Sequence, residues 1–231
     1  MKLKTLIHRD ARKWFYRQFR YHWLTERLCN WKNRTNTLRL HEIDFDITVS
    51  DGDVIVDCGA NVGDLTSRFA STPARVIAFE ASPLVFSVLQ RRFKKHPRVQ
   101  CVNHGVWHEH GSLSFSIPAR RGSSDDIDVS EGSSFLESKH AIGNVVDVSC
   151  IDFPEWILAQ PFRIRLLKMD IEGAECGVIE SMLAKKAFDK IDFAVIETHE
   201  AQMPYLAERT ERIRSALKAH GLDKRIRLDW V

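Results

Sequence analysis

From residue 50 onward, short apolar runs alternate with longer stretches in which apolar residues recur every three or four positions. The short runs are typical of strands buried on both faces, and the longer stretches are typical of amphipathic helices. We therefore expect strands at 53–59, 74–80, 98–103, 164–170 and 192–197, and helices at 62–71, 82–96, 175–190 and 207–221. This alternation predicts an α/β fold, a doubly wound, mostly parallel sheet with helices on both faces.

Residues 104–150 interrupt the alternation. The segments "GSLSFSI" and "NVVDVSC" read as strands, and a polar run rich in Ser, Gly and Asp, residues 119–136, lies between them. We expect a short antiparallel excursion with a loop, inserted between the third and fourth strands of the sheet.

The first 30 residues differ from the rest of the chain in charge. They hold eight Lys or Arg against Asp10 and Glu26, with six aromatic residues interleaved. We expect a basic aromatic helical extension over 1–40, followed by a single domain over 41–231. Two roles are open for residues 1–30: docking to an anionic membrane, a nucleic acid or a partner, or packing of the aromatics on the main domain or on a second copy of the chain.

Composition excludes several classes of protein. The 34 basic and 31 acidic residues leave a net charge of +3, which by itself does not indicate a nucleic-acid binder. The five cysteines stand singly, which argues against a disulfide framework and a cysteine-rich zinc site and fits a reducing cytoplasm. No stretch approaches the roughly 20 apolar residues of a membrane span, and charges break the N-terminus too early for a signal peptide. We expect a soluble, cytoplasmic protein.

The stretch "VIVDCGANVGDLTSRF", residues 54–69, contains two glycines in the turn after the first strand. At this place in a doubly wound sheet, glycines let the backbone approach a nucleotide-like ligand. The turn lacks the GxGxxG spacing of dinucleotide sites, and the chain has no GxxxxGK[ST] phosphate loop. Glu80 ends the second strand, where a carboxylate can accept both hydroxyls of a ribose. These features favour a ligand with a ribose but without phosphates, a description that S-adenosylmethionine meets.

Four segments, "VIVDCGANVGDLT", "AFEASP", "LLKMDIEGAE" and "VIETHE", occur in this order in the chain. In sequence and spacing they resemble the FkbM family of class I methyltransferases, and the resemblance covers about residues 43–222. It implies a Rossmann-like, seven-stranded sheet and S-adenosylmethionine as the methyl donor. It also implies methylation of a hydroxyl on a sugar, a glycan or a related small natural product.

The resemblance further implies roles for individual residues. Those expected to bind the donor are Asp57, Gly59, Asn61 and Gly63 beside its methionine portion, Glu80 at the ribose and Asn103 near the adenine. For Asp57, the alternative is a carboxylate that accepts hydrogen bonds from the N–H groups of its own turn.

The expected catalytic residues are His199, Asp170 and Glu197. Asp170 ends the fourth strand, next to the expected position of the transferable methyl group. Glu197 and His199 lie on the same side of the fifth strand by its period of two, provided that the strand continues as far as His199. With an unperturbed pKa near 6.5, His199 is the natural base for an acceptor hydroxyl, and Glu197 or Glu200 would orient its ring. Glu175 is expected to stabilise the start of its helix.

A hard-metal site can also be drawn from these residues, namely from Asp170, Glu172, Glu197 and His199. The resemblance supplies no metal requirement, so we expect no metal. Lys168 lies inside a strand, where we expect an ion pair with a nearby carboxylate.

Three functions remain open at this point. The preferred one is an O-methyltransferase acting on a small molecule or glycan, without a nucleic-acid partner. The second is a nucleic-acid methyltransferase, which the basic N-terminus supports but the absence of a [DN]PP[YFW] tetrapeptide opposes. The third is an adaptor that keeps the fold without the chemistry, and docks to a membrane or to another chain through residues 1–30. The final segment "GLDKRIRLDWV" predicts one last strand, where this fold usually closes with two.

Overall fold

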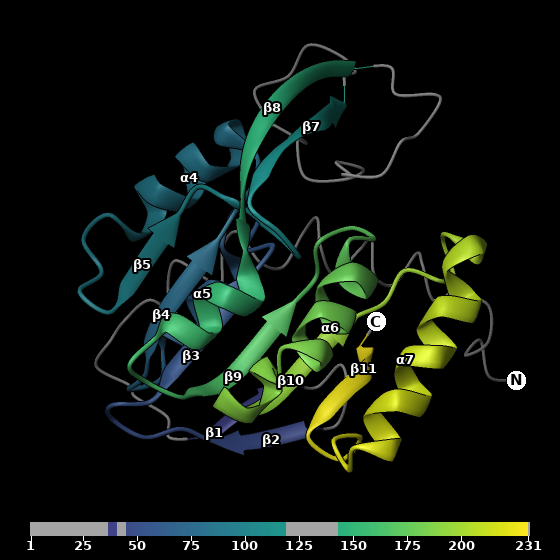
Figure 1. Cartoon of the computed structure of the whole chain (residues 1–231). Coiled ribbons are helices and arrows are strands. Elements are labelled where there is room, and N and C mark those ends of the chain that lie inside the picture. Colours follow the sequence, from purple (N-terminus) through teal and green to yellow (C-terminus); the bar gives the residue numbers. More distant parts are fainter. Residues whose placement is uncertain (1–36, 41–44, 119–142, 231) are drawn as a thin grey trace, which may run out of the picture.

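The computed structural model describes residues 37–40, 45–118 and 143–230 (Figure 1). Its central sheet has six strands in the order β11-β10-β9-β3-β4-β5, and every neighbouring pair is parallel. The strands are β3 (Val54–Cys58), β4 (Arg75–Phe79), β5 (Val99–Val102), β9 (Ile164–Met169), β10 (Ile191–Glu197) and β11 (Ile226–Trp230). The five expected strands are confirmed within a residue or two. The described sheet has one strand fewer than the expected seven, because β11 pairs directly with β10.

The order of the strands reverses between β3 and β9, so the carboxyl ends of these two strands flank the topological switch point. Ligands of doubly wound folds bind in the crevice outside this point, because the loops that follow the two strands run in opposite directions there. The expected doubly wound fold is thus confirmed, and the segments after β3 and β9 contain four of the predicted site residues, Gly59, Asn61, Gly63 and Asp170.

Helices cover both faces of the sheet. The helices α5 (Phe153–Ala159), α6 (Glu175–Ala184) and α7 (Ala207–Ala219) contribute to one core cluster, while α3 (Asp64–Ala70) and α4 (Pro83–Phe93) pack against the other face. Successive side chains of a strand point to opposite faces of the sheet. In β3, Val54 and Val56 belong to the first cluster and Ile55 belongs to the second. Each strand is therefore apolar on both faces, as the continuous apolar runs predicted.

The helix expected over 175–190 is shorter than the sequence pattern indicated. It ends at Ala184, and a 3₁₀ turn, η1 (Ala187–Lys190), follows before β10. Lys186 has a φ of 57°, a left-handed conformation that ends the helix, and Phe188 is buried beyond it. A second 3₁₀ turn, η2 (Pro204–Leu206), precedes α7.

The hairpin of β1 (Thr37–Leu40) and β2 (Phe45–Thr48) corrects one expected boundary. Leu38 and Ile47 are buried in the same cluster as Ile55 of the central sheet. Residues 37–40 are therefore a strand packed on the main domain, although the sequence pattern assigned them to a helical extension. The rest of that predicted extension, residues 1–36, lies outside the described residues.

A second, three-stranded sheet joins β5 to β9. Its strands are β6 (Gly105–Trp107), β7 (Gly111–Pro118) and β8 (Gly143–Asp152); β7 pairs with β8 antiparallel. The predicted antiparallel excursion is thus confirmed. The strands β7 and β8 extend beyond the carboxyl edge of the central sheet (Figure 1). The predicted polar loop, 119–136, lies outside the described residues. No helix in the described part of the chain is long and apolar enough to span a bilayer.

Candidate active site

Gly59 brings the ends of β3 and β9 together. Its φ is 72°, and a Cβ at this position would lie 1.8 Å from the carbonyl oxygen of Asp170. The backbone N–H of Asp170 donates to the carbonyl of Cys58 over 3.1 Å. A side chain at position 59 would therefore push apart the two strand ends that flank the switch point. This close approach places Asp170 beside the predicted donor-binding turn.

The other two positions of the turn are explained by local packing and conformation. Gly63 has a φ of 91°, and a Cβ there would lie 2.5 Å from the ring of Phe93 and 2.7 Å from Leu89, both on α4. Asn61 has a φ of 52°, which Asn tolerates better than most residues, and its side-chain oxygen accepts the Val62 N–H over 2.7 Å. These contacts account for the residue types without a ligand. The roles of Gly59, Asn61 and Gly63 in donor binding stay predictions.

Asp57 forms part of a sealed ionic cluster below the turn. It is fully buried, and its carboxylate accepts a hydrogen bond of 2.6 Å from the Thr66 hydroxyl. In the pairing of β3 with β9, Asp57 lies directly opposite Lys168, and Lys168 Nζ is 3.5 Å from Asp57 Oδ1. The ammonium also donates to the carbonyls of Gly59, over 2.8 Å, and Cys58, over 3.2 Å. The expected acidic partner of Lys168 is thus confirmed. The partners of Asp57 are side chains, whereas the alternative interpretation expected N–H groups of its own turn.

Asp170 links this cluster to the solvent. Its Oδ2 is 3.7 Å from Lys168 Nζ, and its side chain is 16% exposed, against 3% for Lys168. Burial lowers the pKa of Lys168, but the negative charges of Asp170 and Asp57 raise it further, so the net shift is upward. The ammonium therefore stays charged, and Asp57 serves the structure of the strand ends. Whether Asp57 also contacts the donor stays a prediction.

Glu80 follows β4, beside the turn, and its carboxylate fits the expected ribose. One oxygen accepts the Asn61 N–H over 2.9 Å and the other accepts the Ser82 N–H over 2.8 Å. A carboxylate offers about four lone-pair positions, so each oxygen keeps the capacity for one further donor, such as a ribose hydroxyl. Burial raises the pKa of Glu80, and the two backbone hydrogen bonds oppose that shift. The residues present thus fit the ribose of S-adenosylmethionine.

Asn103 supports Glu80 from the end of β5. Its amide nitrogen donates to the carbonyl of Glu80 over 2.8 Å and to that of Ala81 over 3.0 Å. These bonds hold the backbone that presents the Glu80 carboxylate. A contact between Asn103 and the adenine stays a prediction, and it would use the amide oxygen of this side chain.

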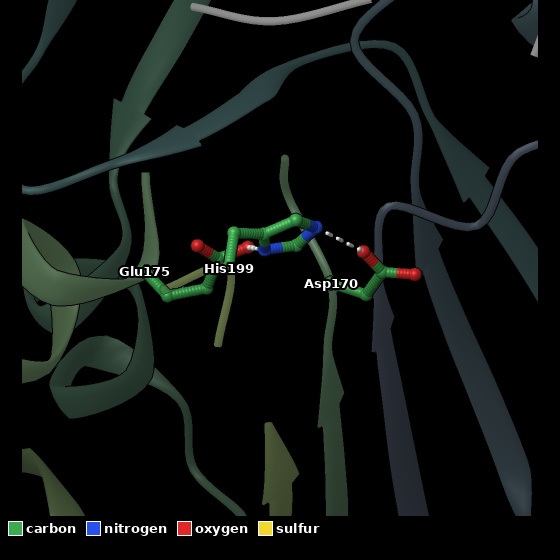
Figure 2. Close-up of side chains that lie close together, drawn as sticks. All are labelled: Asp170, Glu175 and His199. Carbon is green, nitrogen blue, oxygen red and sulfur yellow. Dashed lines mark ion pairs between the residues drawn. The ribbon is translucent and has the colours of Figure 1, made fainter. Parts of the chain in front are cut away.

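His199 lies at the centre of a second ionic cluster, at the same edge of the sheet. The ring is 6% exposed; its Nε2 is 3.7 Å from Asp170 Oδ1 and 3.5 Å from Glu172 Oε2. Its Nδ1 is 3.3 Å from Glu175 Oε1. Figure 2 shows the ring between Asp170 and Glu175, with one nitrogen directed at each carboxylate. The structure thus brings the two predicted catalytic residues Asp170 and His199 together.

Glu175 has a larger part in this cluster than its expected role at the start of α6. It is 1% exposed, and its two oxygens accept the N–H groups of Ile171, over 2.7 Å, and Gly173, over 3.0 Å. Glu172 and Gly173 adopt φ values of 57° and 99°, so the chain turns back over the carboxylate. Glu175 therefore closes the loop after β9 and also holds His199. The Glu-Gly pair at 172–173 was the signal in the sequence for this turn.

The ionisation of His199 differs from what the sequence suggested. Burial lowers the pKa of the ring, but contacts with Glu172 and Glu175 and the charge of Asp170 raise it further, to about 11. The expectation of a ring with a pKa near 6.5 is therefore wrong for this arrangement, because three carboxylates surround the imidazole. The ring is protonated at neutral pH.

The residues proposed to orient His199 lie elsewhere. Glu200 forms an ion pair with Arg214, and Glu197 is buried at the end of β10, where its negative charge acts on Lys168. The carboxylate closest to Nδ1 is that of Glu175. The carboxylate beside Nδ1 therefore comes from Glu175, at the start of the helix that follows β9, and not from the residues at the end of β10 that the sequence suggested.

A groove of about 480 Å³ adjoins the His199 cluster. Gly173, in the loop between Glu172 and Glu175, contributes to its lining, as do Trp107, Tyr205, Arg209 and Arg212. Arg209 is held by Glu180 through two hydrogen bonds, of 2.8 and 2.6 Å. The groove thus combines aromatic surfaces with polar groups, next to the end of β9.

Comparisons with known proteins agree with this architecture. The Methyltransferase FkbM domain family matches residues 57–223, most of the chain. Methyltransferase 1 of Beauveria bassiana is 28% identical over 175 residues, covering 69% of this chain and 70% of that protein. Ribosomal RNA small subunit methyltransferase A of Thermotoga maritima is 46% identical over 48 residues, which is 21% of this chain and 17% of that protein.

Solved structures with a similar arrangement share little sequence with this chain. The structure named "putative rRNA-methylase" from Clostridium thermocellum has a TM-score of 0.38 at 12% identity, over 74% of this chain and 72% of that one. Aeropyrum pernix fibrillarin with bound S-adenosyl-L-methionine has a TM-score of 0.33 at 12% identity, over 58% of this chain and 40% of that one. It is the match over residues 57–223, which contain both ionic clusters and Glu80, that identifies the chain as a member of the FkbM family of S-adenosylmethionine-dependent methyltransferases.

Proposed function

We propose that this protein transfers the methyl group of S-adenosylmethionine to a hydroxyl oxygen of a sugar, a glycan or a related small molecule. The observation that carries the proposal is the half-open cluster of Asp170, Glu172 and His199 beside Glu80. Hydroxyl groups are hydrogen-bond donors, and carboxylate oxygens at this edge of the sheet are acceptors for them. The acceptor oxygen forms a bond to the methyl carbon as the carbon–sulfur bond of the donor breaks, and S-adenosylhomocysteine leaves. The hydroxyl proton passes to the carboxylate of Asp170, and the protein has to hold the acceptor oxygen in line with the methyl group.

In this proposal Asp170 and His199 are the residues that touch the acceptor hydroxyl. Asp170 is tied to the strand ends through Lys168, and Glu175 holds the ring of His199, so neither side chain has to be ordered when the acceptor binds. Glu172 is 39% exposed and is the carboxylate of the cluster that an incoming ligand reaches first. Glu197, buried nearby at the end of β10, is proposed to set the charge of the site.

The groove beside Gly173 is the proposed position for the rest of the acceptor. Tyr205 is 68% exposed at its rim, and Trp107 lies in its lining. Aromatic rings present flat apolar faces, while Arg209 and Arg212 present N–H donors. This combination is suited to a ring-shaped molecule with several hydroxyl groups.

The test begins with the donor. Calorimetry with S-adenosylhomocysteine should show binding, and NAD and ATP should show none. A set of hydroxylated acceptors, incubated with labelled S-adenosylmethionine, should then yield a product in which the label lies on oxygen. Donor binding together with methylation of RNA fragments, but of no hydroxylated small molecule, would overturn the proposed acceptor class in favour of the nucleic-acid alternative.

A variant of His199 tests the catalytic assignment. His199→Ala should lower the methylation rate by roughly 10²-fold, with little change in donor affinity, because the acceptor oxygen loses the protonated ring that positions it. Glu200→Gln is the matched control, because Glu200 is the next residue and pairs with Arg214. The control should keep the wild-type rate. A wild-type rate in His199→Ala would remove His199 from the reaction.

A further inference from the structure

The surface at the end of α4, next to the start of β5, is strongly basic. Between Glu80 and Glu109 the sequence contains no Asp or Glu, whereas residues 91–98 include five Lys or Arg: Arg91, Arg92, Lys94, Lys95 and Arg98. β5 is an edge strand of the central sheet, and α4 and β5 lie on the side of the molecule away from α7 (Figure 1). No residue of α4 lines the groove beside Gly173. This basic surface is therefore separate from the proposed acceptor site.

Two of the five basic side chains are held by the fold. Arg92 pairs with Asp64 on α3 over 2.7 Å, and Arg98 donates to the carbonyl of Thr72 over 3.1 Å. The other three are exposed and form no ion pair among the described residues: Arg91, Lys94 and Lys95. Three positive charges therefore face the solvent here without an acidic partner in the described part of the chain.

α4 also presents an apolar side chain beside these charges. Leu84 is 57% exposed, which makes it one of three exposed large apolar side chains in the described part of the chain. Leu84, Val88 and Arg91 follow one another at spacings of four and three residues, and Lys95 follows four residues later, just past the end of α4. These spacings place them on one side of the helix. The opposite side is buried through Val85, Leu89 and Phe93.

This combination of charges and an apolar side chain fits a membrane with anionic lipids. Anionic headgroups attract Lys and Arg side chains, and an exposed leucine enters the boundary between headgroups and acyl chains. A nucleic acid would use the charges but would gain nothing from Leu84. Bases also stack on aromatic side chains, and neither aromatic residue of α4, Phe86 or Phe93, is exposed. The observations therefore favour the lipid surface.

We propose that the basic surface docks this protein on a membrane that contains anionic phospholipids, with Arg91, Lys94 and Lys95 at the headgroups and Leu84 in the boundary region. The docking does not depend on the identity of the methyl acceptor. Because the attraction is between charges at a solvated surface, it requires anionic lipid and weakens as salt is added.

The experiment measures co-sedimentation of the full chain with vesicles of phosphatidylcholine, with and without about 30% phosphatidylglycerol. We expect binding only to the vesicles that contain phosphatidylglycerol, and less binding at high salt. The double variant Lys94→Glu/Lys95→Glu should weaken this binding by more than about 10-fold, because two attractive charges become repulsive.

Lys218→Glu/Lys224→Glu is the matched control. It makes the same change in net charge at two exposed lysines, one in the last turn of α7 and one in the turn after it. Residues 1–30 are intact in both double variants, so a contribution from that segment is common to the two. The control should bind the vesicles within about 2-fold of the wild type, because its substitutions lie away from the docking surface.

Leu84→Ser tests the apolar part of the surface. It should weaken vesicle binding by about 5-fold, because a partly buried leucine is lost from the membrane boundary. Leu158→Ser, at a side chain of α5 that is 40% exposed, should leave binding unchanged. The melting curves of both variants should match that of the wild type, since neither side chain is buried in the core.

Three results would overturn the proposal. Equal losses in the two lysine variants would show that net charge or residues 1–30 drive the binding. Absence of binding to vesicles with phosphatidylglycerol at low salt would exclude the lipid surface. Binding of an RNA oligonucleotide that is lost in Lys94→Glu/Lys95→Glu, without binding of vesicles, would assign the surface to a nucleic acid. Affinity for S-adenosylhomocysteine should be the same in all of these variants, so the outcome is independent of the proposed function.

Discussion

Lys168 and His199 are both cationic side chains that lie among carboxylates at the same edge of the sheet, and both contact Asp170. They differ in their surroundings. Lys168 is 3% exposed and donates to two backbone carbonyls as well as facing two carboxylates. His199 faces Glu172, which is 39% exposed, and its ring has no such backbone partner among the bonds of the described residues.

This difference in exposure indicates different roles: the Lys168 cluster stabilises the fold, and the His199 cluster can bind a ligand. The Lys168 ammonium faces two carboxylates and donates to two backbone carbonyls, so this cluster is suited to holding β3 and β9 in register. The His199 cluster keeps acceptor capacity on its open side, so it is suited to binding a ligand. Asp170 belongs to both clusters, and through it the rigid strand ends position the residues that we assign to the reaction.

The largest expected effect is on stability, from loss of the sealed cation. Lys168→Met should lower the free energy of unfolding by about 3–5 kcal/mol, because Asp57 is left buried without its partner. Urea denaturation measures this change. Lys185→Met is the matched control. Lys185 also faces two carboxylates, Asp152 and Glu155, but its own side chain is 34% exposed and Glu155 is 59% exposed, so its effect should be clearly smaller. Equal effects in the two variants would contradict the contrast between sealed and open clusters.

Gly63 tests whether the turn next to these clusters is shaped by packing. Gly63→Ala should lower the free energy of unfolding by about 2–4 kcal/mol, since it combines an unfavourable φ with a clash against Phe93 and Leu89. Gly52→Ala isolates the backbone contribution, because Gly52 has a φ of 89° and no atom within 4 Å of the added Cβ.

The added variant Phe93→Leu completes the test of Gly63. Trimming the ring should recover part of the loss in Gly63→Ala, and a double-mutant cycle of urea denaturation curves measures that coupling. Additive effects of the two substitutions would show that the contact with Phe93 is not the cause.

The smallest of these effects concerns donor binding at Glu80. Glu80→Ala should weaken S-adenosylhomocysteine binding by about 1.5–3 kcal/mol, the scale of hydrogen bonds to a charged group, as measured by calorimetry. Glu155→Ala, at a carboxylate that is 59% exposed and remote from the turn, should leave the affinity unchanged. Unchanged affinity in a folded Glu80→Ala variant would remove Glu80 from the donor site.

The sequence by itself determined the elements and the family. The strands were predictable because a strand buried on both faces shows as a continuous apolar run, and the helices because one apolar face repeats every three or four residues. The positions of Glu80, Asp170 and His199 at one sheet edge followed from the parallel topology alone. The hairpin of β1 and β2 was missed although Leu38, Leu40, Phe45 and Ile47 alternate with polar residues, because each strand is only four residues long and lies next to the basic segment.

Only the tertiary structure decided which side chains of the site contact one another and which of them are charged. The pairing of β3 with β9 sets Asp57 opposite Lys168, and the turn at 172–173 returns Glu175 to His199. These contacts join residues from different strands and loops, and no local period records them. For the same reason the pKa of His199 was not predictable, since it depends on which charges surround the ring after folding and how little water remains between them.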